Sequence, residues 1–233
     1  AGRGRDLDLG LQVAPEARWT VFLNPDLCLR PGSISRLTAV TGDHDAAVPT
    51  IVDGKGVRQL SLRREPTVLG ALGDALFGDR WPNRPCVLSE TVRDPDDYGH
   101  PGAVDWATGA ALVVATPAVG KVGPWDAERY FLYSEETDYC RRLRAHGSTI
   151  HFVPGAVVQH QGAGSGTSDA LHALQEVNRV RYFRTWHGDV TSALFTGVIV
   201  LKHLLRIHRR EARVAVCALL SARARSTLPG GDR

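Results

Sequence analysis

The chain has 233 residues, of which 43% are hydrophobic and 23% are charged. This is the composition of an ordinary globular protein, and it excludes a disordered or fibrous chain. The formal net charge is only +3, too small for a protein whose whole surface binds a polyanion, so we expect no nucleic-acid partner. Cysteines occur without a CxxC pair, which predicts no structural zinc site and no disulfide framework; we expect reduced, buried thiols in a cytosolic protein. They are Cys28, Cys86, Cys140 and Cys217.

The first half of the chain alternates short apolar runs with turn signals. The run WTVFL predicts a buried strand over 19–23 that ends at the turn signal Asn24-Pro25-Asp26. A helix is expected after Gly32 and a second strand over 46–52. Residues 57–103, rich in Pro, Gly and Arg, predict a long surface excursion with one helix near 68–78.

The second half continues the mixture of strands and helices. Residues 104–115 are strongly apolar and should lie in the core. A helix should follow the acidic residues near position 135 and end at Gly147, a residue type suited to a C-cap. Strands are expected over 148–154 and 156–160, and a helix over 170–187. Short buried strands mixed with helices indicate an α/β fold.

The tail from 190 to 224 is apolar and basic by turns. Its helical spacing places Val190, Leu194, Val198, Leu201 and Leu205 on one face. Its least polar segment is far shorter than the ~20 residues that span a membrane. Two readings are open: an amphipathic helix lying on an anionic membrane surface, or a helix packed on the domain with a solvated basic side.

Asn24-Pro25-Asp26 is the first candidate site. A carboxylate at the C-terminal end of a strand lies where open α/β sheets bind ligands, and Asp26 offers the oxygen ligand that a hard divalent cation prefers. A turn that merely closes the strand explains the same residues.

Three carboxylates, Glu135, Glu136 and Asp138, form the second candidate site. In a helix Glu135 and Asp138 share a face, and Glu136 points about 100° away. Acids after Ser134 suit a helix N-terminus, so a stable helix start explains them. A general base explains them too.

Two further stretches have both a structural and a functional reading. His160 ends a predicted strand before the glycine-rich GAGSG, where it can ligate a metal or serve the structure. GAGSG lacks the Lys-Ser/Thr of a P-loop. Small residues follow Trp106, including Gly109; they allow a ligand to approach the backbone, or simply tight packing in the core.

In chain order, FLNPD, WATGAALVV, VGPWDAERYFLYSEETDYCRRLRAHG and HFVPGAVVQHQGAGSG closely resemble family 2 glycosyltransferases, and among these the bacterial rhamnosyltransferase-like members. The resemblance runs from about Leu9 to Gly188. It implies a GT-A fold, an α/β sandwich that uses a nucleotide-sugar donor and usually Mg²⁺ or Mn²⁺. Nothing ahead of Trp19 resembles the family's first strand and nucleotide-binding loop, so we expect an N-terminally incomplete GT-A domain over 1–188, with basic amphipathic helices over 189–233.

The resemblance also assigns site residues. Asn24-Pro25-Asp26 takes the place of the family's Asp-x-Asp, with Asp26 as metal ligand and Asn24 on the donor side, and His160 matches a histidine that completes the metal site in some relatives. Glu135-Glu136 takes the place of the Glu-Asp pair whose second member is the base. We therefore expect Glu136 as the base, with Glu135 the alternative. Asp138 matches the next acid of that motif, and Trp106 and Gly109 match a stretch lining the acceptor side.

The expected function is an inverting, metal-dependent glycosyltransferase of the hexosyltransferase type that works in cell-envelope biosynthesis. It would move a sugar, with rhamnose the candidate, from a dTDP- or UDP-sugar to a glycan or lipid-linked acceptor. The expected location is cytoplasmic, peripheral on the inner leaflet of the plasma membrane. The alternative is a truncated, inactive relative that acts as a membrane-associated interaction module.

Overall fold

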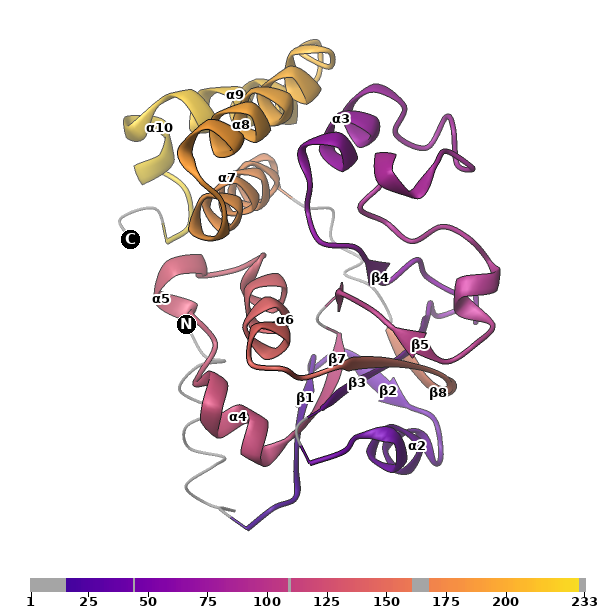
Figure 1. Cartoon of the computed structure of the whole chain (residues 1–233). Coiled ribbons are helices and arrows are strands. Elements are labelled where there is room, and N and C mark those ends of the chain that lie inside the picture. Colours follow the sequence, from indigo (N-terminus) through magenta and orange to yellow (C-terminus); the bar gives the residue numbers. More distant parts are fainter. Residues whose placement is uncertain (1–15, 44, 109, 161–167, 231–233) are drawn as a thin grey trace. The chain divides into compact units, whose positions relative to one another are not determined.

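The structure is a computed structural model that describes residues 16–43, 45–108, 110–160 and 168–230. The chain divides into two compact units. The first comprises residues 1–64, 91–125 and 136–164, and the second comprises 65–90, 126–135 and 165–233. The predicted boundary after Gly188 therefore does not coincide with the division between these units. The strands of the first unit come from the beginning and from the middle of the chain, as Figure 1 shows.

A mixed sheet forms the middle of the first unit. Its path is β1-β7-β3-β8-β2, and β5 pairs with β8. Only β3 and β8 run parallel; the other pairs are antiparallel. The strands are β1 (Trp19–Leu23), β2 (Leu27–Leu29), β3 (Ala46–Val52), β5 (Gly102–Ala103), β7 (Ala111–Ala115) and β8 (Ile150–His160). A separate two-stranded sheet pairs β4 (Leu62–Arg63) with β6 (Trp106–Ala107). The predicted α/β class is confirmed.

Both faces of the main sheet are buried, because alternate residues of its central strands enter different clusters. Ala47 and Val113 pack with Leu37 of α2 (Ser33–Val40) on one face. On the other face, neighbouring strand residues pack with α4 (Thr116–Val122) and with Tyr139 and Leu143 of α6 (Glu135–Ala145). Successive side chains of a strand point to opposite faces of the sheet. The unit is therefore layered, with α2 on the opposite side of the sheet from α4 and α6 (Figure 1).

One strand replaces the two predicted over 148–160. β8 continues through Pro154, but its register with β3 jumps from Pro49↔Val153 to Thr50↔Val157. Proline has no N–H to donate to the ladder, so the regular pairing is interrupted here. The strand forms a bulge and then pairs with β3 again. The hydroxyl of Ser33 donates to the Val157 carbonyl at 2.7 Å and accepts from its N–H at 3.1 Å, which satisfies the backbone beside the bulge.

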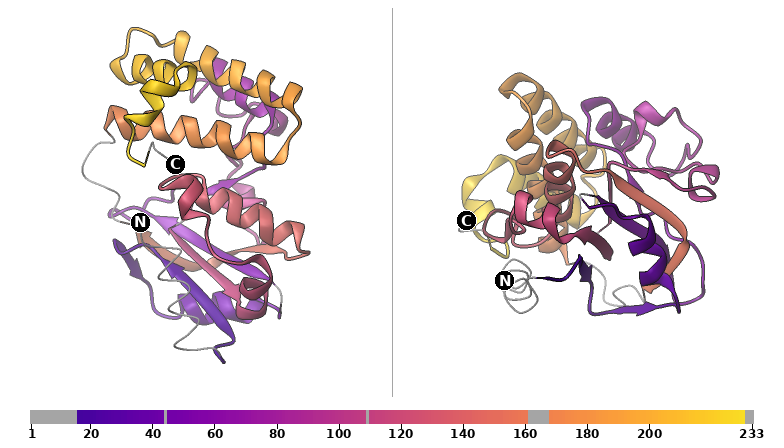
Figure 2. Two further views of the ribbon diagram at one scale, coloured as in Figure 1. Left: turned by 90° about the vertical axis from the view of Figure 1, so that its left-hand side faces the viewer. Right: turned by 60° about the horizontal axis from the view of Figure 1, so that its bottom comes forward.

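Helices make up the second unit. They are α3 (Val68–Leu76), α5 (Ala127–Tyr130), α7 (Asp169–Trp186), α8 (Asp189–Leu204), α9 (Arg210–Leu220) and α10 (Ala222–Ser226). α7 packs against α8 and α9, and α8 packs against α3, as the views in Figure 2 also show. Their apolar residues form one cluster that includes Phe183, Phe195 and Ile199. No helix in the described part of the chain is both long and apolar enough to cross a membrane.

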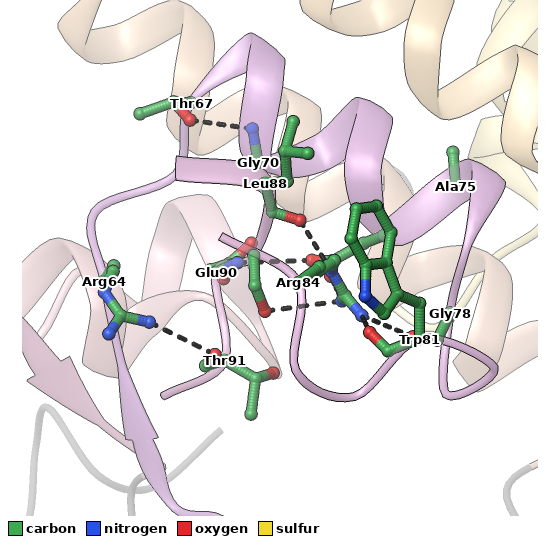
Figure 3. A network of polar contacts seen from close by, with 12 residues as sticks. Arg64, Thr67, Gly70, Ala75, Gly78, Trp81, Arg84, Leu88, Glu90 and Thr91 are labelled. Carbon is green, nitrogen blue, oxygen red and sulfur yellow. Dashed lines mark hydrogen bonds and ion pairs between the residues drawn. The ribbon is translucent and has the colours of Figure 1, made fainter. Parts of the chain in front are cut away.

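The predicted excursion over 57–103 contains the expected helix, α3, and its central loop is mostly exposed, but this loop is also held by a buried arginine (Figure 3). The Arg84 side chain is 0% exposed and pairs with Asp74 of α3. Its guanidinium also donates to the carbonyls of Gly78, Trp81 and Leu88 at 2.6, 2.9 and 2.7 Å. A loop rich in Pro, Gly and Arg thus becomes ordered because one side chain satisfies several carbonyls at once.

Cysteine and tail predictions need correction. The cysteines are free, as expected, but only Cys140 is buried; Cys28, Cys86 and Cys217 are exposed. Part of the basic excess of the tail is used inside the second unit: Lys202 pairs with Glu176 at 2.6 Å, and Arg206 donates to the Ala75 carbonyl at 3.0 Å. The two alternatives drawn from the sequence placed these basic side chains at a membrane surface or in solvent, and neither included contacts of this kind.

Candidate active site

Asp26 and His160, 134 positions apart in the sequence, meet at one edge of the main sheet. The His160 Nε2 atom lies 3.0 Å from Asp26 Oδ2. The two side chains are 22% and 44% exposed, respectively. A carboxylate and an imidazole are thus in contact with each other and still open to a solute.

Strand pairing brings this pair together. β2 runs antiparallel to the end of β8, with Leu27 opposite His160, so the residue before Leu27 reaches the histidine. The turn that carries Asp26 is anchored at its other end, because the Asn24 N–H donates to the Ala110 carbonyl at 2.9 Å. The turn therefore has a fixed register on both sides, and Asp26 is placed by backbone geometry.

The donor set fits a divalent cation. Carboxylate oxygen and imidazole nitrogen are ligands for Mn²⁺ and related ions, and Mg²⁺ accepts the carboxylate alone with water and phosphate oxygens. Two protein ligands at a solvent-open position leave coordination positions for a phosphate-bearing ligand. The side chains present therefore fit the metal ion that the sequence predicts.

The acidic residues lie at the start of α6, as predicted. Glu135 and Asp138 are buried, at 7% and 3% exposure, whereas Glu136 is partly exposed. The Asp138 carboxylate accepts from Arg142 Nε at 2.8 Å, one turn further along the helix. Of the three carboxylates, Glu136 is therefore the one with the most access to a solute, and Asp138 is engaged in an ion pair.

Aromatic rings fix α6 against the sheet of the first unit. Tyr139 stacks on Trp125, with ring centroids 5.0 Å apart, and both rings contact Phe22 of β1. Burial raises the pKa of Tyr139 above its ordinary value, so its hydroxyl stays neutral. At the C-terminal end Gly147 has a φ of 87°, the left-handed conformation that glycine adopts without strain, which confirms the predicted C-cap.

The segment that leads into α6 has an unusual backbone. Phe131, Tyr133 and Ser134 have φ values of 30°, 69° and 65°, positive angles that non-glycine residues rarely adopt. Ser134 therefore differs from the extended conformation usual for an N-cap residue. Backbone strain of this kind concentrates at functional sites, where the surrounding structure holds it in place.

Asn178 of α7 holds this segment, and sequence reasoning missed it. Its side-chain amide is 0% exposed and donates to the carbonyls of Tyr130, Leu132 and Tyr133 at 3.2, 2.8 and 3.4 Å. The available signal was a lone amide on the apolar face of a predicted helix, next to Val177. A buried amide needs partners, and these carbonyls are the partners.

The predicted acceptor-side residues are only partly described. Trp106 lies in β6, 8% exposed, and its indole N–H donates to the Arg64 carbonyl at 3.0 Å. That bond fixes the ring within the core of the first unit. Gly109, the GAGSG segment and the residues before Glu16 lie outside the described residues.

A second group of metal-compatible side chains lies in the second unit. One ligand atom from each of His172, Glu176 and His203 lies within 4.8 Å of the others. Burial alone would raise the pKa of Glu176, but the ammonium of Lys202 and the neighbouring His203 hold it below its ordinary value overall. Lys202 thus already supplies the positive charge that this carboxylate needs, and the group is a buried ion-pair network.

Comparison with known proteins gives the class. The N-acetylglucosaminyl-diphospho-decaprenol L-rhamnosyltransferase of Mycobacterium tuberculosis, in strains CDC 1551 and H37Rv alike, is 32% identical over 212 residues, which cover 84% of this chain and 68% of that protein. Rhamnosyltransferase WbbL of Escherichia coli K12 is 25% identical over 142 residues, 58% of this chain and 49% of WbbL. No protein-family profile matches.

Among solved structures, the crystal structure of GalNAc-T7 with UDP, GalNAc and Mn²⁺ aligns with a TM-score of 0.47 at 14% identity, over 84% of this chain and 40% of that one. This likeness is too weak to carry an argument. The similarity to the mycobacterial enzyme does carry one: the chain is a glycosyltransferase. It belongs to the rhamnosyltransferase-like members of family 2, the GT-A glycosyltransferases that the sequence motifs predict.

Proposed function

We propose that this chain is an inverting, metal-dependent rhamnosyltransferase that transfers its sugar from a nucleotide-sugar donor to a lipid-linked glycan acceptor. The observation that carries the proposal is the contact between Asp26 and His160 at the sheet edge, in a chain of this family. The mycobacterial relative is named for rhamnose and for a decaprenol-linked diphosphate acceptor. The proposal takes its donor sugar and its acceptor class from the name of that relative.

Asp26 and His160 would hold Mg²⁺ or Mn²⁺. Such an ion offsets the charge that develops on a departing diphosphate. Asn24, whose backbone is fixed by the Ala110 carbonyl, keeps the turn rigid on the donor side. A rigid turn matters because a displacement of about 1 Å in a catalytic group can lower the rate ~100-fold.

Glu136 is the proposed base. An inverting transfer is one displacement, in which the acceptor hydroxyl loses a proton as its oxygen attacks the anomeric carbon. Glu136 combines a helix-start position with partial exposure, whereas Glu135 and Asp138 are buried. Asp138, paired with Arg142, has a positioning part: it holds the first turns of α6.

Docking on an anionic inner-leaflet surface is the proposed route to a lipid-linked acceptor. On α8 one stripe, including Phe195, Ile199 and His203, is buried. On the face whose spacing predicted an amphipathic helix, Val190, Leu194 and Leu205 are 78%, 59% and 52% exposed. Leu201 is 37% exposed, and Val198 packs against the apolar cluster of the second unit. Exposed apolar side chains gathered on one helix suit a membrane interface.

A transfer assay tests the function. The full chain is incubated with dTDP-rhamnose or UDP-rhamnose, a short-chain N-acetylglucosaminyl diphosphate lipid and Mn²⁺, and the product is analysed by mass spectrometry and NMR. We expect a rhamnosylated lipid with the opposite anomeric configuration to the donor, and its loss on chelation of the metal. Asp43→Asn, at an exposed carboxylate of the same unit, is the control. A product formed equally well with chelator present refutes the metal-dependent reaction.

A further inference from the structure

A cavity of about 450 Å³ lies wholly within the helices of the second unit. Its volume is typical of ligand pockets, which run from about 300 to 1,000 Å³. Half of the described lining residues are arginines, and no residue in this described lining is acidic. The lining comprises Arg129, Val177, Val180, Arg181, Arg184, Thr185, Leu219 and Arg225.

Neutral oxygens orient these guanidinium groups. Hydrogen bonds run from Arg129 to Thr185 Oγ1 (3.2 Å), from Arg181 to the Arg129 carbonyl (2.6 Å), from Arg184 to Thr196 Oγ1 (3.4 Å) and from Arg225 to the Leu219 carbonyl (3.0 Å). Such bonds fix geometry but leave the positive charge in place. Among the residues that the structure describes, Asp126 brings a carboxylate to 3.4 Å from Arg129, and four of the lining side chains are cationic.

The guanidinium groups that line the cavity affect one another's protonation. Burial lowers the pKa of Arg181 below its ordinary value; Tyr130 opposes this shift, and the positive charges of Arg225 and Arg129 add to it. Like charges held together in a partly buried space repel, and an anion that enters the space relieves that repulsion. Guanidinium groups in particular suit phosphate oxygens, which they bind through paired N–H donors.

The apolar part of the lining narrows the class of anion. Val177, Val180 and Leu219 supply aliphatic surface beside the arginines, and none of the lining residues that the structure describes has an aromatic ring on which a nucleobase would stack. Leu220, the next residue of α9, is 68% exposed. Phosphate-binding groups beside aliphatic surface match a phosphorylated lipid better than a nucleotide.

We propose that this arginine cavity binds the diphosphate group of a lipid-linked acceptor, with the first part of the lipid against its aliphatic wall. The inference rests on the proposed function, because the transferase is what requires such an acceptor. It assigns acceptor binding to the second unit, and donor and metal binding to Asp26 and His160 in the first.

Binding measurements on the full chain test this inference. The probes are farnesyl diphosphate, inorganic pyrophosphate and UDP, each titrated by calorimetry into the wild type, Arg129→Gln and Arg184→Gln. Both arginines are exposed at the rim, so the variants should fold, which their melting temperatures check. Arg223→Gln, an exposed arginine of α10 outside the cavity, is the matched control.

Loss of a charge-assisted hydrogen bond predicts about tenfold weaker binding of farnesyl diphosphate in each cavity variant. We expect the control to bind like the wild type, pyrophosphate to bind less tightly than farnesyl diphosphate, and UDP affinity to stay the same in all proteins. Equal farnesyl diphosphate affinity in all four proteins would overturn the site. Pyrophosphate bound as tightly as the lipid, or UDP weakened in parallel with it, would overturn the lipid assignment.

Hydrolysis of dTDP-rhamnose by the wild type gives a separate readout of the transferase. A wild-type enzyme that hydrolyses the donor while all variants bind farnesyl diphosphate equally would overturn the cavity and leave the transferase standing. Absent hydrolysis and transfer, with the expected binding losses, would overturn the transferase instead.

Discussion

At the scale of single residues, the central question is which carboxylate of α6 takes the proton. Glu136→Gln keeps the size of the side chain and removes its basicity, so kcat should fall about 100- to 10,000-fold, with little change in the donor KM. Steady-state transfer measured at saturating acceptor gives the comparison. Asp138→Asn should instead lower the melting temperature, because it weakens the pair with Arg142.

Glu135→Gln provides the contrast in this experiment. It changes an adjacent carboxylate that is 7% exposed. If the large loss of kcat appears in Glu135→Gln and not in Glu136→Gln, the base is Glu135 and the proposed assignment is wrong.

At the level of residues, the sequence indicated which motifs to consider but not which contacts the fold would form. The motif order pointed to Asp26 and His160, and the structure places them 3.0 Å apart, although their role stays a prediction. Asn178 and Arg84 were not predicted, because nothing local in the sequence says which distant carbonyls a buried polar side chain will meet.

At the scale of elements, the positive-φ segment before α6 depends on α7. Asn178→Ala removes the donor shared by three carbonyls and should destabilise the fold by about 1–3 kcal/mol. That corresponds to a melting temperature several degrees lower. It should also lower kcat at a temperature where the variant is folded, because the backbone that positions Glu136 is no longer held.

Gln175→Ala, at an exposed position of the same helix, is the control for general effects on α7. Circular dichroism supplies the folded fraction and transfer assays supply kcat. A variant Asn178→Ala with lower stability but unchanged kcat in the folded state would limit Asn178 to a structural part.

Element boundaries followed from the sequence more reliably than element partners did. The strands β1 and β3 match their predicted bounds, since apolar runs bounded by turn residues define a strand locally. The continuity of β8 was missed because Pro154 and Gly155 read as a break. Whether a strand bulges or ends there depends on β3 and Ser33, which are far away in the sequence.

At the scale of the whole molecule, the exposed stripe of α8 predicts reversible membrane binding. The double variant Leu194→Glu/Leu205→Glu should bind vesicles of phosphatidylcholine with anionic phosphatidylglycerol at least about tenfold less well than the wild type, because each leucine loses favourable apolar burial and gains a repelled charge. Cosedimentation with such vesicles measures it.

Val57→Glu is the matched control, since Val57 is 60% exposed on a loop of the first unit. It should bind vesicles like the wild type. Equal binding by the wild type and the double variant would contradict a docking role for this stripe.

The measurement that tests the central claim most directly is Mn²⁺ affinity, followed by electron paramagnetic resonance with UDP present. A site built from Asp26 and His160 predicts that Asp26→Asn and His160→Gln each weaken Mn²⁺ binding at least about tenfold, while the exposed-carboxylate control Asp43→Asn binds like the wild type. Unchanged Mn²⁺ affinity in both site variants would contradict the assignment of the metal site to this pair.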